Sequence, residues 1–126
     1  MNPTPEELYH KGIVAFNDGD YYGAHDYWED LWSDHKLDDS NFIQGLIQMA
    51  VGCFHIGNKN INGSRGLFTK CRPKLEAYSA YHREVDVAAL LDFVDASLKQ
   101  LDNIDHADEF SWQGVPKLKL PLENLE

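Results

Sequence analysis

Apolar residues recur with a helical period along most of this chain. The clearest case follows Asp86, where apolar positions are spaced three or four residues apart, as in an amphipathic helix. These positions are Val87, Leu90, Leu91, Val94, Leu98 and Leu101. The segment from about Asn41 to Gly57 is instead apolar almost all round. A helix of that kind is normally buried, so this segment is predicted to be the central element of the fold.

Start and stop signals divide the rest of the pattern into further helices. Thr4-Pro5-Glu6-Glu7 has a capping residue, a proline at the first helical position and a glutamate three residues after the cap, which together favour a helix start. The residues from Asn17 to Asp20 end this helix and lead into a second one, from about Tyr21 to His35. A fourth is predicted from about Ser64 to Tyr81, where Pro73 should kink or divide it.

The fold class predicted from these elements is all-α. About five helices with short connections form an antiparallel bundle over residues 1–104. Periodicity is lost after Asn103, and residues 105–126 carry Trp112 and alternating leucines among prolines, so they are expected to form an extended tail over the bundle. The sequence has no internal repeat or low-complexity tract, so residues 1–126 are predicted to be a single domain.

Composition adds constraints on partners and location. The chain has 11 Lys and Arg against 21 Asp and Glu, for a net charge of −10, which disfavours a nucleic-acid partner. An acidic surface also attracts cations towards a cleft. The first residues lack a signal-peptide pattern and no run reaches about 18 apolar residues, so we expect a cytoplasmic protein with no membrane partner.

Some reactive residue types have simple structural interpretations. Cys53 and Cys71 lie in apolar helical patterns without metal or redox spacing, and are interpreted as small buried hydrophobic residues. Asp39 is interpreted as part of a solvated turn or cap, and His82 as a surface residue.

A row of polar and aromatic residues marks the second predicted helix. His25, Glu29 and Trp32 are spaced i, i+4 and i+7, which places an imidazole, a carboxylate and an indole on one side of the helix. His25 and Glu29 can therefore point at one centre, as ligands of a divalent metal ion or as general acid and base. Trp32 is a candidate ligand contact, although an indole on such a helix is more simply explained as a core anchor.

A second row lies on the otherwise apolar third helix. Gln44, Gln48 and His55 are spaced i, i+4 and i+11. An unpaired buried amide costs about 1–3 kcal/mol, so the two glutamines need partners, and Glu29 and Trp32 are the nearest candidates. If the two helices pack antiparallel, the rows meet. We therefore predict that Glu29 is buried between the helices, within hydrogen-bond reach of at least one other polar residue of the two rows.

The two rows carry a resemblance to a known family. His25, Glu29 and Trp32 match a His-x-x-x-Glu-x-x-Trp motif. The segment from Gln44 to Asn58 matches a second motif, Gln-Gly-Leu-Ile-Gln followed by an apolar run, a histidine and Gly-Asn. Over about residues 9–75 the chain therefore resembles the domain of unknown function 309 family.

The resemblance implies a small helical fold with a suspected metal-binding or otherwise functional motif, and it implies no particular activity. At Asp26 family members usually have glutamate. The aspartate keeps the charge and shortens its reach. The resemblance also adds Asn58, in the Gly-Asn pair of the second motif, to the candidate ligand contacts.

Two functions remain open from the sequence. The first is a site for a divalent metal ion or a small molecule between the second and third helices, with hydrolysis as a candidate reaction. Its candidate residues divide by role into catalytic His25 and Glu29, metal-ligating His25, Glu29 and His55, and ligand-binding Trp32, Gln44, Gln48 and Asn58. The alternative is a non-enzymatic helical interaction module whose polar rows are structural and whose partner docks through the Trp112 tail or an exposed helix face. A homo-oligomer is compatible with either function.

Overall fold

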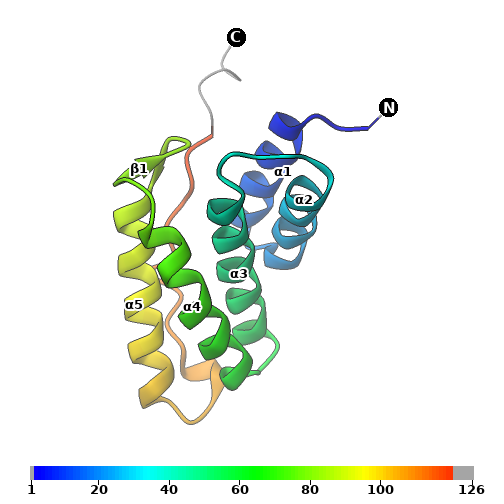
Figure 1. The fold of residues 1–126 in the computed structure, drawn as a ribbon. Coiled ribbons are helices and arrows are strands. Elements are labelled where there is room, and N and C mark those ends of the chain that lie inside the picture. Colours follow the sequence, from blue (N-terminus) through cyan, green and yellow to red (C-terminus); the bar gives the residue numbers. More distant parts are fainter. Residues whose placement is uncertain (1, 121–126) are drawn as a thin grey trace.

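The computed structural model describes residues 2–120, which form five α-helices, one short β-hairpin and one 3-10 turn (Figure 1). The helices are α1 (Pro5–Asn17), α2 (Tyr21–Asp34), α3 (Ser40–Gly57), α4 (Ile61–Glu76) and α5 (Val87–Asn103). The hairpin pairs β1 (Tyr81–His82) antiparallel with β2 (Val85–Asp86), and the 3-10 turn is η1 (Ala107–Glu109). The all-α fold class is therefore confirmed. Among residues 2–120 no helix has the length and apolar character needed to cross a membrane.

The helices begin at the capping residues that the sequence indicates. Thr4 and Glu7 form a capping box at the start of α1. The Asp20 side chain accepts a hydrogen bond from the backbone in the first turn of α2, and the Asp86 side chain does the same for α5. Each of these side chains satisfies a backbone N–H that has no partner inside the helix, which fixes where the helix starts.

The fourth helix differs from its prediction at both ends. Asn60 caps it through a side-chain hydrogen bond to the backbone, so α4 begins before the predicted Ser64. The helix runs through Pro73 undivided. The predicted continuation to Tyr81 was wrong: the helix ends at Glu76, and residues 81–86 form the hairpin, whose two turn residues adopt positive φ.

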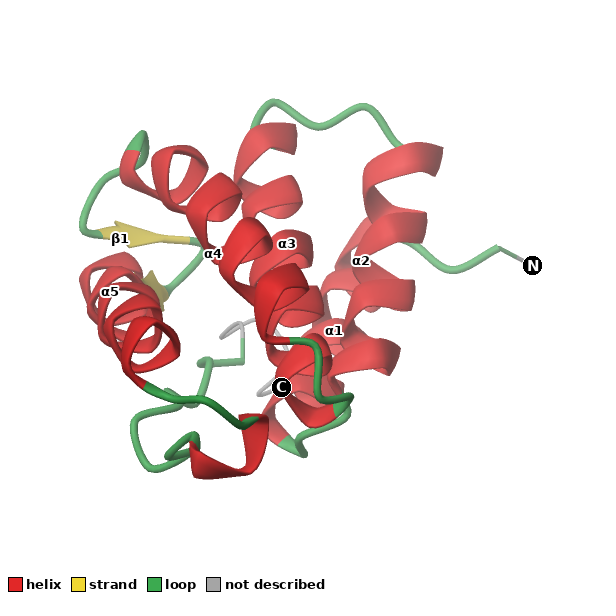
Figure 2. Cartoon of the chain, turned by 90° about the horizontal axis from the view of Figure 1, so that it is seen from below, coloured by secondary structure: helices red, strands yellow, loops and turns green. Residues whose placement is uncertain are grey.

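α3 lies at the centre of the arrangement. It packs against α2 and α4, while α1 packs on α2 and α5 packs on α4 (Figure 2). α2 and α3 run antiparallel, as predicted (Figure 1). Two glycines of α3 permit close approach of α4: a Cβ on Gly45 would lie 3.0 Å from Leu75 Cδ2, and one on Gly52 would lie 3.2 Å from Phe68 Cε1. Side chains of α4 therefore lie directly on the backbone of α3.

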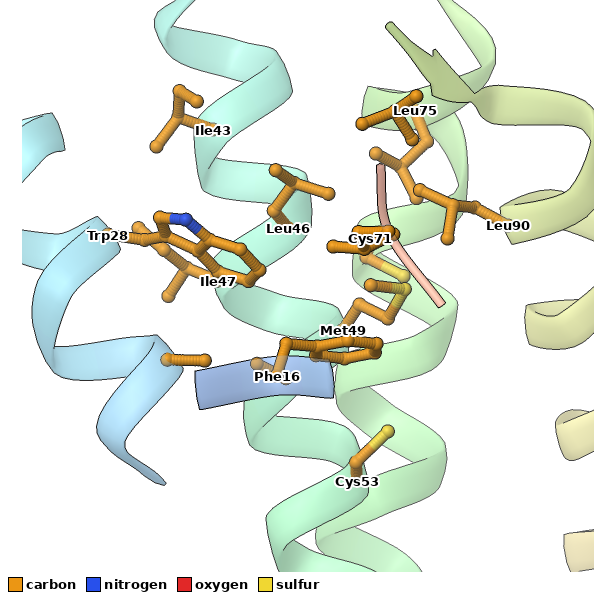
Figure 3. Close-up of a cluster of buried hydrophobic side chains, with 14 of the residues drawn as sticks. Phe16, Trp28, Ile43, Leu46, Ile47, Met49, Cys53, Cys71, Leu75 and Leu90 are labelled. Carbon is orange, nitrogen blue, oxygen red and sulfur yellow. The ribbon is translucent and has the colours of Figure 1, made fainter. Parts of the chain in front are cut away.

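The core is formed by apolar side chains from all five helices (Figure 3). Its largest fully buried members are Trp28, Phe16, Phe42 and Phe68. Cys53 and Cys71 are also buried, as predicted. Burial raises the pKa of both thiols, so both stay protonated at neutral pH and act as small apolar side chains.

Trp28 joins α1 to α2 within this core. Its side chain is fully buried, and its Nε1 donates a hydrogen bond to the carbonyl oxygen of Tyr9 at 3.3 Å. Gly12 makes the contact possible, because a Cβ there would lie 2.1 Å from Trp28 Nε1. Only glycine therefore fits against this indole.

A partly buried charged cluster attaches the hairpin to the start of α3. Asp39 accepts hydrogen bonds from Arg83 Nε at 2.5 Å and Arg83 Nη2 at 2.9 Å, and its Oδ2 lies 2.8 Å from His82 Nε2. Only 14% of the Asp39 side chain is exposed. The interpretations of Asp39 as solvated and of His82 as a surface residue were therefore wrong, because the hairpin that brings His82 and Arg83 against Asp39 was not predicted.

The C-terminal segment runs back along the bundle after α5 (Figure 1, orange to red). It begins with the unpredicted turn η1, and between Phe110 and Leu120 it has neither helix nor strand. Asn17 holds it in place: the side-chain amide donates to the carbonyl oxygen of Leu118 at 2.9 Å and accepts from Leu118 N at 2.7 Å. Residues 121–126 of the predicted tail lie outside the described residues, as does Met1.

Gly12→Ala is expected to lower the free energy of unfolding by about 1–3 kcal/mol, because the added methyl group overpacks the Trp28 indole. Urea unfolding followed by tryptophan fluorescence measures this difference. Gly66→Ala is the matched control, since a Cβ at that helical glycine meets no atom within 4 Å. It should raise stability by about 0.5–1 kcal/mol through helix propensity. Equal effects of the two substitutions would contradict the proposed contact.

The Asp39 cluster predicts a pH-dependent contribution to stability. Hydrogen bonds from the Arg83 guanidinium lower the pKa of Asp39 from 3.8 to about 2. A carboxyl group whose pKa is lower in the folded chain stabilises the fold above its unfolded pKa, and this contribution is lost as pH falls from about 4 to about 2. Asp39→Asn should therefore cost about 2 kcal/mol at neutral pH and progressively less in acid.

Urea midpoints of the wild-type chain and Asp39→Asn, compared from neutral to acidic pH, measure this contribution. Asp38→Asn is the control, because it removes a neighbouring carboxylate that is exposed. It should change stability little at any pH. If the difference in urea midpoint between the wild-type chain and Asp39→Asn stays constant as pH falls, the ionised Asp39–Arg83 pair is not the source of that difference.

Candidate functional site

The His25–Glu29 pair forms as predicted, but at the surface. His25 Nε2 lies 3.2 Å from Glu29 Oε2, which makes an i, i+4 ion pair when the imidazole is protonated. The Glu29 side chain is 54% exposed, so the prediction that it is buried between the helices was wrong. Hydration explains this position, because an ionised carboxylate with one imidazole partner is more stable in water than between two helices.

The polar row of α3 lies on a strip between α2 and α4. At about 100° per residue, Gln44, Gln48 and His55 fall between the glycine face that α4 covers and Phe54. The ring of Phe54 contacts that of Tyr22 at the start of α2, with centroids 5.3 Å apart. All three side chains of the row are half-buried. The row therefore flanks the interface between α2 and α3 and does not lie inside it.

Three buried polar atoms of the two rows lack partners. Among the described residues, His25 Nδ1, Gln48 Oε1 and His55 Nδ1 are buried and accept or donate no hydrogen bond. His25 Nδ1 does lie 3.4 Å from Asp26 Oδ1, but the two are not aligned for a hydrogen bond. We expected Gln48 to pair with Glu29 or Trp32. Its side-chain oxygen forms no such hydrogen bond. Such atoms are uncommon in proteins and call for an explanation.

The predicted metal ligands do not assemble in the structure. In residues 2–120 no group of three or more His, Cys, Asp or Glu side chains could hold a metal ion. His55 therefore does not join His25 and Glu29 as a third ligand. Trp32 is 40% exposed, so its interpretation as a core anchor was wrong, and Trp28 one turn earlier has that place.

The predicted ligand-binding residues Trp32 and Asn58 line two different pockets. Trp32 lines an open pocket of about 440 Å³ beside the turn between α2 and α3. Asn58 lines another pocket of about 440 Å³, where α2 begins and α3 ends. The single site expected from the sequence is thus divided between the two ends of the helix pair.

The pocket that Asn58 lines is here named the aromatic pocket. Its aromatic lining residues come from α2, α3 and the C-terminal segment, and are Tyr21, Tyr22, Phe54 and Trp112. The rings of Tyr21 and Trp112 are stacked, with centroids 5.7 Å apart and planes inclined by 12°. The other lining residues are Gly19, Asp20, Cys53, Gly57 and Asn58.

The polar rows and the aromatic pocket are neighbours. The His25 ring lies 5.4 Å from the Tyr22 ring, and the His55 ring lies 6.1 Å from the Phe54 ring, between centroids. The Tyr21 hydroxyl adds no charge to the pocket wall at neutral pH, and burial raises its pKa further, to about 12. The histidines of the predicted site therefore contact two walls of the aromatic pocket from outside it.

Of the four aromatic residues that line the pocket, the sequence pointed only to Trp112, as part of a tail on which a partner would dock; Tyr21, Tyr22 and Phe54 were not selected. Tyr21 and Tyr22 directly follow the turn at Gly19 and Asp20, so their place at an exposed helix start was a usable signal. The place of Trp112 beside α2 had no such signal, because this contact depends on the path of the C-terminal segment.

Comparison with known protein families gives a match to part of the chain. A family model described as a domain of unknown function, DUF309, matches residues 9–67. Over this segment the chain is similar to the DUF309 family. The resemblance noted from the sequence is thereby confirmed. The DUF309 segment includes both polar rows and every residue that lines the aromatic pocket except Trp112. A comparison with curated proteins finds no match.

Proposed function

We propose that this protein binds a small molecule in the aromatic pocket. The observation that carries the proposal is the lining, in which four aromatic side chains border an open space of about 440 Å³. Small-molecule sites are typically concave, span about 300–1,000 Å³ and combine aromatic walls with a few polar groups. Asp20 and Asn58 supply the polar groups here.

The neighbouring polar rows support the same location. Leaving His25 Nδ1, Gln48 Oε1 and His55 Nδ1 buried without partners costs about 1–3 kcal/mol for each atom. Proteins tolerate such costs chiefly at functional sites, where local rules of packing and pairing are broken. The rings of His25 and His55 contact aromatic walls of the pocket, so these two of the three unpaired groups lie next to the proposed binding site.

Binding is favoured over hydrolysis by the arrangement of the candidate catalytic groups. His25 and Glu29 pair with each other, and neither lines the aromatic pocket. A divalent metal ion on this pair would have two protein ligands, fewer than the three that catalytic zinc sites typically have. The proposal is therefore confined to binding, and it assigns no chemical step to His25 or Glu29.

Gly57→Leu should block the aromatic pocket. A Cβ at Gly57 meets no atom within 4 Å, so the leucine side chain can extend into open space without displacing its neighbours. Prodan, an uncharged naphthalene dye whose emission shifts to the blue in apolar sites, serves as the probe. We expect it to bind the wild-type chain, and to bind Gly57→Leu at least about tenfold more weakly because the leucine occupies its contact area.

Gly66→Leu is the matched control for this experiment. Gly66 is also a helical glycine with open space around its Cβ position, but it does not line the aromatic pocket. This variant should bind Prodan as the wild-type chain does. Failure of the wild-type chain to bind the dye, or an equal loss of binding in the two variants, would overturn the proposal.

A further inference from the structure

We infer that the ligand of the aromatic pocket carries a positive charge, as a small amine or quaternary ammonium compound. The inference rests on the proposed function and specifies the chemical class of its ligand. Three features of the pocket favour a cation over a neutral or anionic molecule. These are its aromatic faces, its carboxylate and the helix end beside it.

The aromatic rings offer attractive faces to a cation. The negative face of a ring attracts an ammonium group within about 6 Å of its centroid, and tryptophan does so most strongly. Trp112 and Tyr22 are 40% and 54% exposed, so both are accessible to a ligand that enters from solvent. Tyr22 and Phe54 are inclined to each other by 50°, which presents ring faces in different directions around the pocket.

Asp20 supplies a full negative charge at the rim of the pocket. Its Oδ1 accepts a hydrogen bond from Gly23 N at 2.9 Å, and the residue remains exposed. Its charge exceeds that of the positive end of the α2 macrodipole, which amounts to about half a unit charge. Among the described residues that line the pocket there is no Lys, Arg or His, so no basic side chain in the lining opposes a cation.

The carboxyl end of α3 adds to this negative potential. Gly57 is the last residue of the helix and Asn58 is its C-cap, and both line the pocket. The final carbonyl groups of a helix together carry about half a negative charge. The net charge of −10 on the chain also draws cations towards any cleft on its surface.

The C-terminal segment completes the cation site. Trp112 lies outside the DUF309 match. It stacks on Tyr21 and makes a T-shaped contact with Phe110, at 5.0 Å between ring centroids. The ring best suited to a cation is therefore contributed by residues beyond the matched segment.

A matched pair of ligands tests the charge directly. Choline and 3,3-dimethylbutan-1-ol have nearly the same shape, but only choline is charged. Each is titrated against the wild-type protein loaded with Prodan at low ionic strength, and displacement of the dye gives its affinity. We expect choline to bind at least about fivefold more tightly than the alcohol, and this ratio to fall as salt is added.

Asp20→Asn separates the charge of this residue from its role as a helix cap. Asparagine caps a helix about as well as aspartate, so the variant should fold normally. It should lower the affinity for choline about three- to fivefold and leave that for the alcohol unchanged. Asp86→Asn makes the same change at the cap of α5, whose side chain accepts a hydrogen bond from Ala89 N, and should alter neither affinity.

Equal binding of choline and the alcohol would overturn the inference and leave the pocket as a site for neutral molecules. A choline affinity that Asp20→Asn does not change would overturn it as well. The inference is also overturned if neither choline nor the alcohol displaces Prodan. None of these results would contradict the proposed function. That function is tested separately, by the binding of Prodan to the wild-type chain and to Gly57→Leu.

Discussion

The packing of α4 on the glycines of α3 is the contact on which the rest of the structure depends. Gly45 and Gly52 let Leu75 and Phe68 lie against the α3 backbone, and this fixes one flank of the central helix. The other flank is held by α2, which Trp28 joins to α1 through its buried indole. With both flanks covered, the parts of α3 nearest to solvent are one polar strip and the C-terminal end of the helix. The central helix is therefore open to solvent at these places.

The aromatic pocket follows from the antiparallel order of α2 and α3. Because α2 begins where α3 ends, Tyr22 meets Phe54, and the residue that caps α2 lies at the rim. The side chain of Asp20 thus caps α2 and at the same time carries the charge that a cationic ligand would contact. Hydrogen bonds hold the C-terminal segment on both sides of Trp112, from Gln100 to Ser111 and from Asn17 to Leu118. Elements of the fold therefore supply each component of the proposed site.

Local chemistry made part of this structure predictable from the sequence. Helix starts depend on capping residues a few positions away, and the closeness of His25 to Glu29 follows from their i, i+4 spacing. Whether Glu29 is buried or exposed depends instead on how α2 is rotated about its axis. The fit of Trp28 against Gly12 decides this rotation. Periodicity does not reveal that fit, because it gives the apolar face of a helix and not the neighbour it meets. The place of Trp112 depended on the path of a segment with no periodic signal at all.

The indole signals of the three tryptophans test most directly whether a ligand enters the aromatic pocket. Each gives one Nε1–H peak in a proton–nitrogen correlation spectrum. The Trp28 indole is buried and hydrogen-bonded to Tyr9, Trp32 lines the pocket at the other end of the helix pair, and Trp112 lines the aromatic pocket. On addition of choline we predict that the Trp112 peak shifts with ligand concentration while the other two stay in place. A shift of the Trp32 peak with Trp112 unchanged would contradict the assignment of the site.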